Sequence, residues 1–357
     1  MTARDRVVFV TQAFAPGETL LGVTADWVRA LGERFAGVDV VAQRAPGAPS
    51  LLPRTRVPLR VASMGKDRGA GRVAQAISVI ASLARAARHA RAIIVHMVPA
   101  YAILAAPVAR LARVPVVLWY AHGTAGRALR LAMPVVDRVV TPTRDSFPMA
   151  GAGIEPKVRV TGHGINVARY APGDPPLRGL VLSAGRLSPV KRHELAVEAV
   201  AGGPAWSRLV IAGGPLHAGD TSYRDRLGAA AAASGASGRV DLAGDVAYEA
   251  MPATYRRAWV LAHASRTGSL DKVVLEAAAC GTLVVSSAPS SRTVLDAVPG
   301  LSVPDGDDEA FVAHVREVLG WTAGRRAAAG AALREAVIAG HSLDRWADGV
   351  AAAIPGG

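Results

Sequence analysis

The stretch SRTGSLDKVVLEAAACGTLVVSS, residues 265–287, decides the fold. Its polar, glycine-containing start predicts a loop over Ser265–Leu270. Asp271 is a good first residue for a helix, because its carboxylate accepts backbone N–H groups that the first turn leaves free. Gly281 suits the left-handed end of that helix, and Leu283–Val285 then predicts a buried parallel strand. The stretch therefore predicts a loop, a helix and a strand of an α/β domain.

The start of this helix is a candidate anion site, because its N–H donors and its dipole both favour negative charge. Glu276 lies one turn further along, where a carboxylate can accept hydrogen bonds from the hydroxyls of a ligand. Taken alone, the stretch is equally compatible with an ordinary αβ unit in which Glu276 is a solvated helix residue.

Composition indicates a globular chain of two domains. It has 357 residues, 51% hydrophobic and 19% charged, which is enough to bury a sizeable core. The net charge of +13 is uneven, because residues 1–172 hold 23 basic and 9 acidic side chains and the remainder holds 18 and 19. Such a basic half is typical of contact with an anionic membrane or nucleic acid, and arginine-rich coding bias is the alternative.

Three observations concern the cellular compartment. The single cysteine, Cys280, excludes an internal disulfide and fits a reducing compartment. The charged start Met1–Asp5 runs directly into a strand, so no signal peptide is expected. Residues 92–109 are uncharged for the length of a membrane span, but His96 and two prolines interrupt them. They divide better into a strand and a helix.

The first half alternates apolar strands with helices, the rhythm of a parallel sheet covered on both faces. Strands are expected at 6–11, 38–43, 57–62, 92–98, 116–120 and 138–141, and helices at 22–35, 71–91, 101–112 and 126–133. Ligands in such sheets bind beyond the carboxyl ends of the strands. The loops 12–21 and 121–123 are therefore expected on the functional edge.

A glycine- and proline-containing segment at 162–174 reads as an interdomain linker, and a second alternation follows it. Strands are expected at 180–184, 209–212, 240–243 and 259–262, and helices at 190–201, 222–234, 308–319, 324–339 and 343–353. The sequence thus predicts two Rossmann-like halves that face each other across a cleft.

Two further motifs follow strands of the second half. LSAGRLSPVKR at 182–192 predicts a turn and a helix from Pro189, with Gly185 allowing close approach of a ligand. Arg186 and Lys191 are suited to phosphate oxygens, and a surface turn with solvated basic residues is the alternative. VIAGGP at 210–215 places Gly213 and Gly214 directly after a strand, which is a weak signal by itself.

Two motifs that imitate functional ones are set aside. GAGRVA at 69–74 fits a dinucleotide-binding pattern but follows a charged segment instead of a strand. Asp305–Asp307 imitates a metal-binding acid pair, but helix capping explains it better. We therefore expect no metal ligands.

In this order and spacing, LSAGRLSPVKRHELAVEAV, VIAGGP and the 265–287 stretch resemble the retaining glycosyltransferases of family 4. The resemblance covers about residues 160–320 well and the first half more loosely, through YAHG at 120–123 and GHGIN at 162–166. It implies an α/β GT-B fold, with residues 1–165 a Rossmann-like acceptor-binding domain and 166–340 a Rossmann-like nucleotide-sugar-binding domain. Residues 341–357 are expected to form a helix that returns to the first domain.

The resemblance also implies roles at matching positions. The pair that grips the donor diphosphate is matched by Arg186 and Lys191, with Gly185, Gly213 and Gly214 in the neighbouring loops. The ribose-binding acid is matched by Glu276. The loop that touches diphosphate and donor sugar is matched by Ser269, Leu270, Asp271, Lys272 and Val273. The base contact is matched by Val246, and the histidine beside the sugar by His122.

One departure from the family is clear. A second glutamate commonly lies eight positions before the ribose-binding one, and here that position is Gly268. Two alternatives remain open: Asp271 takes over the role of this glutamate, or the donor sugar differs from the usual one.

The expected activity is retaining transfer of a sugar from a nucleotide-diphosphate sugar, UDP-sugar before GDP-sugar, to a hydroxyl of a glycan, lipid or small molecule. Two basic side chains and a helix N-terminus would stabilise the departing diphosphate, so no metal and no cofactor is expected. A cytoplasmic enzyme with peripheral contact to the inner membrane face fits the basic half. The alternatives are a sugar-nucleotide epimerase of the same fold and a non-catalytic basic protein that binds membrane or nucleic acid. Few aromatic residues accompany the arginines, which argues against nucleic acid.

Overall fold

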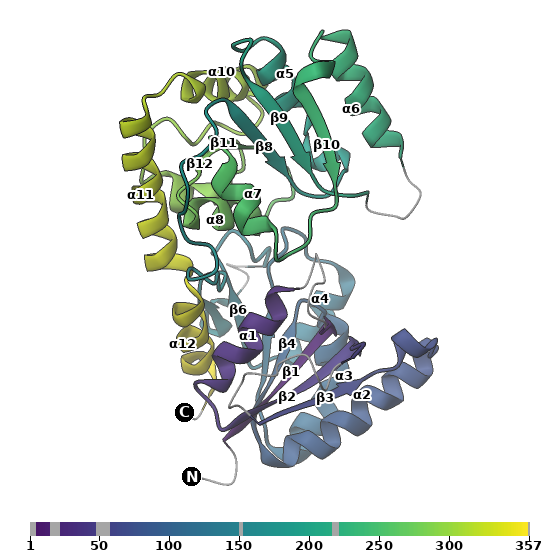
Figure 1. Ribbon diagram of the computed structural model, residues 1–357. Coiled ribbons are helices and arrows are strands. Elements are labelled where there is room, and N and C mark those ends of the chain that lie inside the picture. The colour runs from purple at the N-terminus through teal and green to yellow at the C-terminus, as the bar shows by residue number, and fades with distance from the viewer. Residues whose placement is uncertain (1–4, 15–21, 48–57, 150–152, 216–220, 356–357) are drawn as a thin grey trace. The chain divides into compact units, whose positions relative to one another are not determined.

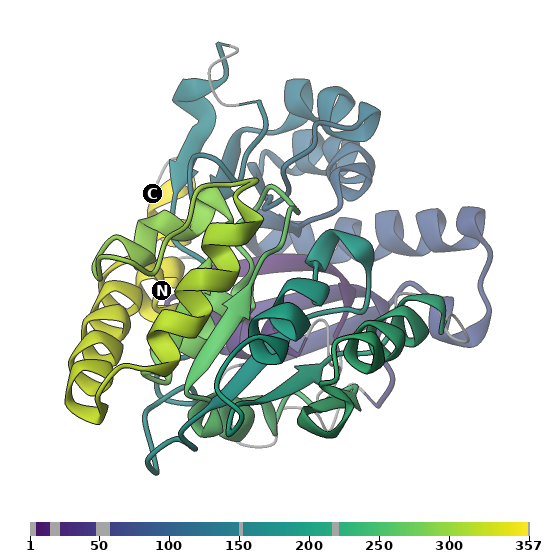
Figure 2. The same cartoon turned by 90° about the horizontal axis from the view of Figure 1, so that it is seen from above.

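A computed structural model describes residues 5–14, 22–47, 58–149, 153–215 and 221–355. The chain forms two compact units, residues 1–164 with 343–357 and residues 165–342. Each unit is an α/β domain built on one parallel sheet (Figures 1 and 2). Residues 15–21 of the expected ligand loop and Val57 of an expected strand lie outside the described residues.

The first domain holds a seven-stranded parallel sheet in the order β3-β2-β1-β4-β5-β6-β7. Its central strands are nearly continuous runs of valine and isoleucine, as expected for strands buried on both faces. The strands are β1 (Arg6–Ala13), β2 (Gly37–Arg44), β3 (Leu59–Ser63), β4 (Ala90–His96), β5 (Val116–Trp119), β6 (Arg138–Thr141) and β7 (Val158–Val160). The helices are α1 (Val23–Gly32), α2 (Arg72–Ala86), α3 (Pro99–Ala112) and α4 (Arg127–Ala132), with α12 (Leu343–Ala353) added from the end of the chain.

The second domain holds a five-stranded parallel sheet in the order β10-β9-β8-β11-β12. Its strands are β8 (Leu180–Ala184), β9 (Arg208–Ala212), β10 (Val240–Gly244), β11 (Val260–His263) and β12 (Leu283–Ser286). Its helices are α5 (Glu194–Ala201), α6 (Ser222–Ala233), α7 (Met251–Arg257), α8 (Lys272–Ala279), α9 (Arg292–Leu295), α10 (Asp308–Leu319) and α11 (Ala323–His341). The strand order reverses between β8 and β11, and at such a point loops at the carboxyl ends diverge and leave room for a ligand.

Helix α12 belongs to the first domain because it packs on α1. Trp27 of α1 and Trp346 of α12 are both fully buried, and their rings stack at 4.8 Å. The Nε1 of Trp27 donates to the carbonyl of Gly164 at 2.9 Å, and a Cβ at Gly164 would lie 2.6 Å from that nitrogen. Packing therefore accounts for Gly164 in the GHGIN motif.

The predicted sheet-and-helix rhythm is confirmed in both halves, with one wrong helix start and three short elements that were missed. The predicted helix 190–201 is wrong at its start, because residues 189–191 form a 3-10 turn and Arg192 takes a left-handed φ of 55°, so α5 begins only at Glu194. The short elements β7, α7 and α9 were not predicted. Residues 92–109 divide into β4 and α3, as expected. Among the described helices, none combines the length and apolar character that crossing a membrane requires.

Candidate functional site

The predicted phosphate-binding residues of the second domain lie at the carboxyl edge of its sheet. Arg186 and Lys191 follow β8, the glycine pair follows β9, and Asp271 follows β11. These loops start from adjacent strands, because β8 pairs with both β9 and β11. Residues separated by 80 positions in the sequence are thereby brought into contact.

The two glycine-containing loops pack on each other. The N–H of Gly185 donates to the carbonyl of Ala212 at 2.9 Å, and that of Leu187 donates to the carbonyl of Gly214 at 2.8 Å. A Cβ at Gly213 would lie 1.9 Å from the carbonyl oxygen of Gly185, and one at Gly214 would lie 2.1 Å from the Asp245 carboxylate. Loop packing alone therefore requires glycine at 213, whereas at 214 only the exposed Asp245 side chain would have to move.

The two predicted phosphate ligands differ in exposure. Arg186 is exposed, and its side chain contacts no acceptor among the described residues. Lys191 ends the 3-10 turn, and its side chain is only 10% exposed. The sequence placed Lys191 at the start of an α-helix, which is wrong, because α5 starts three residues later. A tight turn positions Lys191 instead.

The ammonium group of Lys191 is held by two side chains from the loop after β11. Its Nζ donates to Asp271 Oδ2 at 2.6 Å and to Ser265 Oγ at 3.3 Å. The same Asp271 oxygen lies 2.9 Å from Nε2 of His263, the last residue of β11. His263 Nδ1 lies 2.9 Å from the buried Ser286 hydroxyl. A buried network thus fixes both the carboxylate and the ammonium group.

This network corrects the predicted role of Asp271 as a capping side chain. Asp271 is the N-cap residue of α8, but its carboxylate makes no hydrogen bond to the helix backbone. It turns instead to Lys191 and His263, which supply a full charge and a strong donor. Burial alone would raise the pKa of Asp271, but its hydrogen bond to His263 and its ion pair with Lys191 outweigh burial and hold the pKa well below the usual range. Asp271 is therefore a carboxylate at neutral pH.

Glu276 is more buried than a solvated helix residue, with 6% exposed. Its Oε2 accepts a hydrogen bond from the Tyr255 hydroxyl at 2.9 Å. Burial raises the pKa of Glu276, and the charge of Lys272 and the Tyr255 hydrogen bond oppose that rise. Burial also lowers the pKa of Lys272, which shares the same face of α8. The solvated reading of Glu276 is therefore wrong.

The remaining predicted donor residues surround the start of α8 and the end of β10. Leu270 is buried, whereas Ser269, Val273 and Val246 are partly exposed. Gly268, which replaces the family's glutamate, is exposed and takes a left-handed φ of 71°. No described acid therefore occupies the position of that glutamate.

His122 belongs to the first domain and is exposed in the loop after β5. Its Nδ1 accepts a hydrogen bond from the Thr124 N–H at 3.3 Å and lies 2.9 Å from the Thr124 hydroxyl. Thr124 thus orients the His122 ring through Nδ1 at the carboxyl edge of the first sheet.

Residues 171–332 match the family of glycosyl transferases group 1. The matched segment includes Lys191, Asp271 and Glu276. It lies within the second domain and leaves the first domain, with His122, outside the match.

Two curated relatives, both D-inositol 3-phosphate glycosyltransferases, resemble part of this chain. The protein from Acidothermus cellulolyticus is 36% identical over 198 residues, which are 49% of this chain and 43% of the relative. The protein from Kineococcus radiotolerans is 32% identical over 246 residues, 59% of this chain and 56% of the relative. This chain therefore spans about half the length of these relatives or less.

Solved structures match nearly the whole chain in fold. Anabaena Alr3699/HepE, crystallised in complex with UDP and glucose, has a TM-score of 0.78 at 19% identity and covers 98% of this chain and 99% of its own. Sucrose-phosphate synthase from Thermosynechococcus elongatus has a TM-score of 0.72 at 18% identity and covers 98% of both chains. At such identities the likeness establishes the fold, and the predicted GT-B fold class is confirmed.

Sequence reasoning missed His193, His263 and Tyr255, whose side chains hydrogen-bond within this edge of the second domain. His193 is buried between the Ser183 hydroxyl, 2.7 Å from Nδ1, and the carbonyl of Arg186, 3.2 Å from Nε2. Burial lowers the pKa of His193 to about 4, so the ring is neutral at pH 7. Polar residues at the carboxyl end of a buried strand, such as His263, were the available signal.

The set-aside acidic motif contains a helix cap, as expected. Asp307 is the N-cap of α10, and its Oδ1 accepts the Ala310 N–H at 2.9 Å. Across the part of the chain that the structure describes, no group of three or more His, Cys, Asp or Glu side chains has the arrangement of a metal site.

Proposed function

We propose that this chain is a retaining glycosyltransferase that moves a sugar from a nucleotide-diphosphate sugar to a hydroxyl of an acceptor. The contact of Lys191 with Asp271 carries the proposal, because it joins the predicted diphosphate-binding residue to the start of the helix that bears Glu276. The match to group 1 glycosyl transferases over the same residues supports it.

The chemistry follows from where charge develops. When the bond between the sugar carbon and the phosphate oxygen breaks, the nucleoside diphosphate leaves with increasing negative charge. Lys191 and the exposed Arg186 would stabilise this charge, and the start of α8 would add its N–H donors. The acceptor hydroxyl forms the new bond on the same face of the sugar, and its proton passes to a phosphate oxygen. His122 would orient the sugar, and Glu276 would bind the ribose hydroxyls.

We assign UDP-sugar as the first donor to test and GDP-sugar as the second. The fold neighbour from Anabaena was crystallised with UDP and glucose, which supports this order. For the acceptor, inositol 3-phosphate is the first compound to test because the curated relatives carry that name. Glycans and lipid-linked acceptors follow.

The role that we assign to Asp271 separates two donor-binding schemes. A carboxylate 2.6 Å from Nζ neutralises much of the field of Lys191, so a diphosphate must compete with Asp271 for that ammonium group. In the other scheme Asp271 replaces the missing glutamate and binds a hydroxyl of the donor sugar. The competition scheme is favoured because both oxygens of Asp271 already have partners, Lys191 and His263 on Oδ2 and Thr267 on Oδ1.

Thermal stabilisation by UDP, GDP and ADP tests the proposal most directly. A nucleotide at about 100 times its Kd stabilises the folded state by about 2.7 kcal/mol and raises the Tm. We expect one of the three nucleoside diphosphates to raise the Tm. The corresponding nucleotide sugar should then yield that nucleoside diphosphate as a product when inositol 3-phosphate or another acceptor is added. No response to any of the three would favour a non-catalytic protein. Conversion of the donor sugar to its epimer without an acceptor would favour the epimerase.

Metal dependence is tested with the same turnover assay. If Arg186, Lys191 and the start of α8 suffice for the leaving group, EDTA leaves turnover nearly unchanged. A loss above about tenfold that Mg²⁺ or Mn²⁺ restores would contradict this part of the proposal.

Peripheral membrane contact is the second candidate function, and the surface of α2 favours it. Val73 and Ile77 lie on one helix face and are 74% and 63% exposed, and Arg85 and Arg88 are exposed near its end. Each basic residue contributes about 1 kcal/mol near an anionic surface. We expect sedimentation with anionic but not neutral vesicles at low salt, weakened by combined Val73→Ser and Ile77→Ser and unaffected by Leu177→Ser, an exposed leucine of the other domain. Equal sedimentation with both vesicle types would contradict it.

A further inference from the structure

A large cavity lies at the opposite edge of the second sheet from Lys191. Its volume is about 910 Å³, which is within the range of ligand pockets. Its lining includes Trp259 and Gly281, which precede β11 and β12, and Arg178, which precedes β8. The cavity therefore belongs to the amino ends of the strands, one strand length away from the carboxyl edge.

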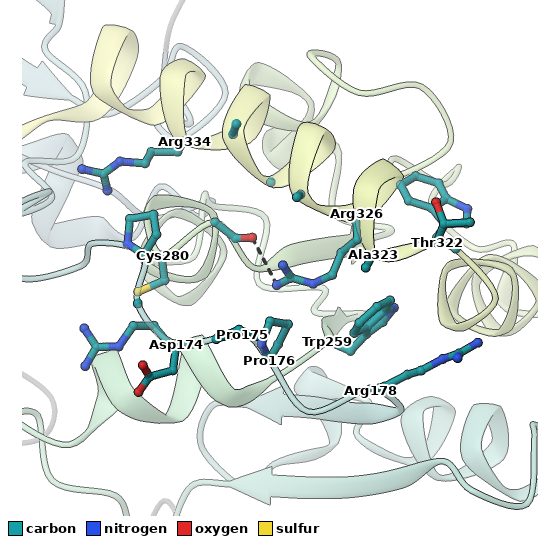
Figure 3. A pocket seen from close by; sticks show the side chains of 18 of the residues that line it. Asp174, Pro175, Pro176, Arg178, Trp259, Cys280, Thr322, Ala323, Arg326 and Arg334 are labelled. Carbon is teal, nitrogen blue, oxygen red and sulfur yellow. Dashed lines mark hydrogen bonds between the residues drawn. The ribbon is translucent and has the colours of Figure 1, made fainter.

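Flat apolar side chains form much of the wall. Trp259 and Trp321 are each 5% exposed, and their indole N–H groups donate to Val318 O and Glu317 Oε1. With these N–H groups satisfied inside the protein, the rings offer apolar surface to the cavity. Pro175 and Pro176 lie across from α11, as Figure 3 shows.

Arg326 reaches from α11 into the middle of this cavity, between Trp259 and Cys280 (Figure 3). Its side chain is nine-tenths buried, and only Nη2 donates to protein acceptors, the carbonyls of Gly281 at 3.3 Å and Ala258 at 3.5 Å. Nε is buried without an acceptor, and neither it nor Nη1 bonds to a described residue. Arginine keeps its charge in proteins. The guanidinium also lies over the Trp259 ring, 5.4 Å from its centroid. Carbonyl dipoles and this ring face thus compensate its positive charge, and no described carboxylate pairs with it.

The other charged side chains of the lining do not neutralise Arg326. Asp174 and Glu335 are exposed at the cavity, and neither forms an ion pair with Arg326 in the described chain. Arg334 and Arg256 donate to backbone carbonyls, and the Arg178 guanidinium lies over the Trp206 ring. Four arginines against two acids leave the lining positive.

We propose that this cavity binds a small molecule that combines one carboxylate with a flat apolar body, with the carboxylate on the Arg326 guanidinium and the body between Trp259 and the proline pair. A carboxylate matches the unused guanidinium donors and supplies the missing opposite charge in a desolvated site. The indole and proline surfaces account for the apolar body. This second site is separate from the proposed sugar-transfer site.

The pair 4-phenylbutyrate and 4-phenylbutyramide tests the proposal, because the two compounds differ in charge and hardly in shape. Thermal stabilisation of the intact chain is measured for each at up to about 10 mM, the range in which so small a ligand binds. We expect the carboxylate to stabilise and the amide to bind at least about tenfold more weakly. Stabilisation by neither compound, or equally by both, would overturn the proposal.

Variants of α11 locate the binding. Arg326→Gln is expected to remove the preference for the carboxylate over the amide. Because loss of Arg326 also removes two hydrogen bonds to the backbone, Ala331→Trp provides a second variant that fills the cavity and keeps the arginine. Ala328→Trp on the same helix is the matched control, since Ala328 is exposed and does not line the cavity. Equal carboxylate binding by Ala331→Trp and Ala328→Trp, or displacement of the carboxylate by UDP, would overturn the proposal.

Discussion

Two buried cations lie at opposite ends of β11 and are compensated differently. At the carboxyl end, Lys191 has a full opposite charge at 2.6 Å, and Asp271 is itself held by His263. At the amino end, Arg326 has the carbonyls of Ala258 and Gly281 and the face of the Trp259 ring, and no described carboxylate pairs with it. The first arrangement is neutral, so an anion must displace or share an internal partner, whereas the second keeps a positive charge that an anion can neutralise. The comparison shows that a buried cation by itself does not indicate an anion site. The side chains that already neutralise the cation must be known first.

Removing the cation of the neutral pair is expected to have the largest effect. Lys191→Ala should lower kcat by about 10²–10³-fold, because in the proposed mechanism its charge acts mainly on the departing diphosphate. The side chain is largely buried, so the variant also leaves Asp271 with less compensation and should lose about 3 kcal/mol of unfolding free energy. Kinetics and urea denaturation are measured together, with exposed Val190→Ala as the control. A folded Lys191→Ala protein with wild-type turnover would refute the assigned role.

Glu276 tests whether the same edge binds ribose. Glu276→Gln keeps the volume and removes the charge that ribose hydroxyls would donate to, at a cost of about 1.5–3 kcal/mol. We expect the KM for the donor to rise by about 10–150-fold with a smaller change in kcat, because ribose carries no developing charge. Tyr255→Phe, which removes the hydrogen bond within the protein, is the comparison. A change confined to kcat would contradict ribose binding.

Asp271→Asn sharpens the comparison, because it converts the neutral pair into an uncompensated cation like Arg326. We expect UDP to bind about tenfold more tightly, a gain of about 1.4 kcal/mol. The pKa of Asp271 is lowered in the folded state, so its ion pair stabilises the fold above the ordinary pKa near 4 and loses this effect as the pH falls below that value. The stability difference between wild type and variant should therefore be constant from pH 5 to 8. If UDP affinity is unchanged and only UDP-sugar affinity falls, Asp271 binds the sugar instead.

His193 is expected to give the smallest effect. Its pKa falls from 6.5 to about 4 in the folded protein, so below pH 6.5 the unfolded chain takes up a proton that the folded chain does not. Unfolding free energy should then fall by about 1 kcal/mol between pH 6.5 and 5.5. His193→Gln should show a correspondingly weaker pH dependence in urea denaturation. An identical pH dependence would mean that folding does not lower the pKa of His193.

The sequence by itself determined the two α/β halves, because buried parallel strands are continuous apolar runs and glycine punctuates the turns. The motifs that contain Lys191, Asp271 and Glu276, and their spacing, also predicted that these residues share one donor-binding site. These signals are local in the sequence. Hydrophobic periodicity and turn-forming residues can therefore be recognised without knowledge of the tertiary structure.

Only the tertiary structure decided what these side chains contact. Asp271 looked like a helix cap, but Lys191 arrives from 80 residues away and offers a stronger partner. Gly213 looked like a ligand-binding glycine, but the carbonyl of Gly185 needs its space. Arg326 carries no motif at all, and its site arises because Trp259, Pro175 and α11 enclose it. Side-chain partners and cavities are formed by segments that are distant in the sequence. Local sequence patterns therefore do not predict them, and they appear only when the chain folds.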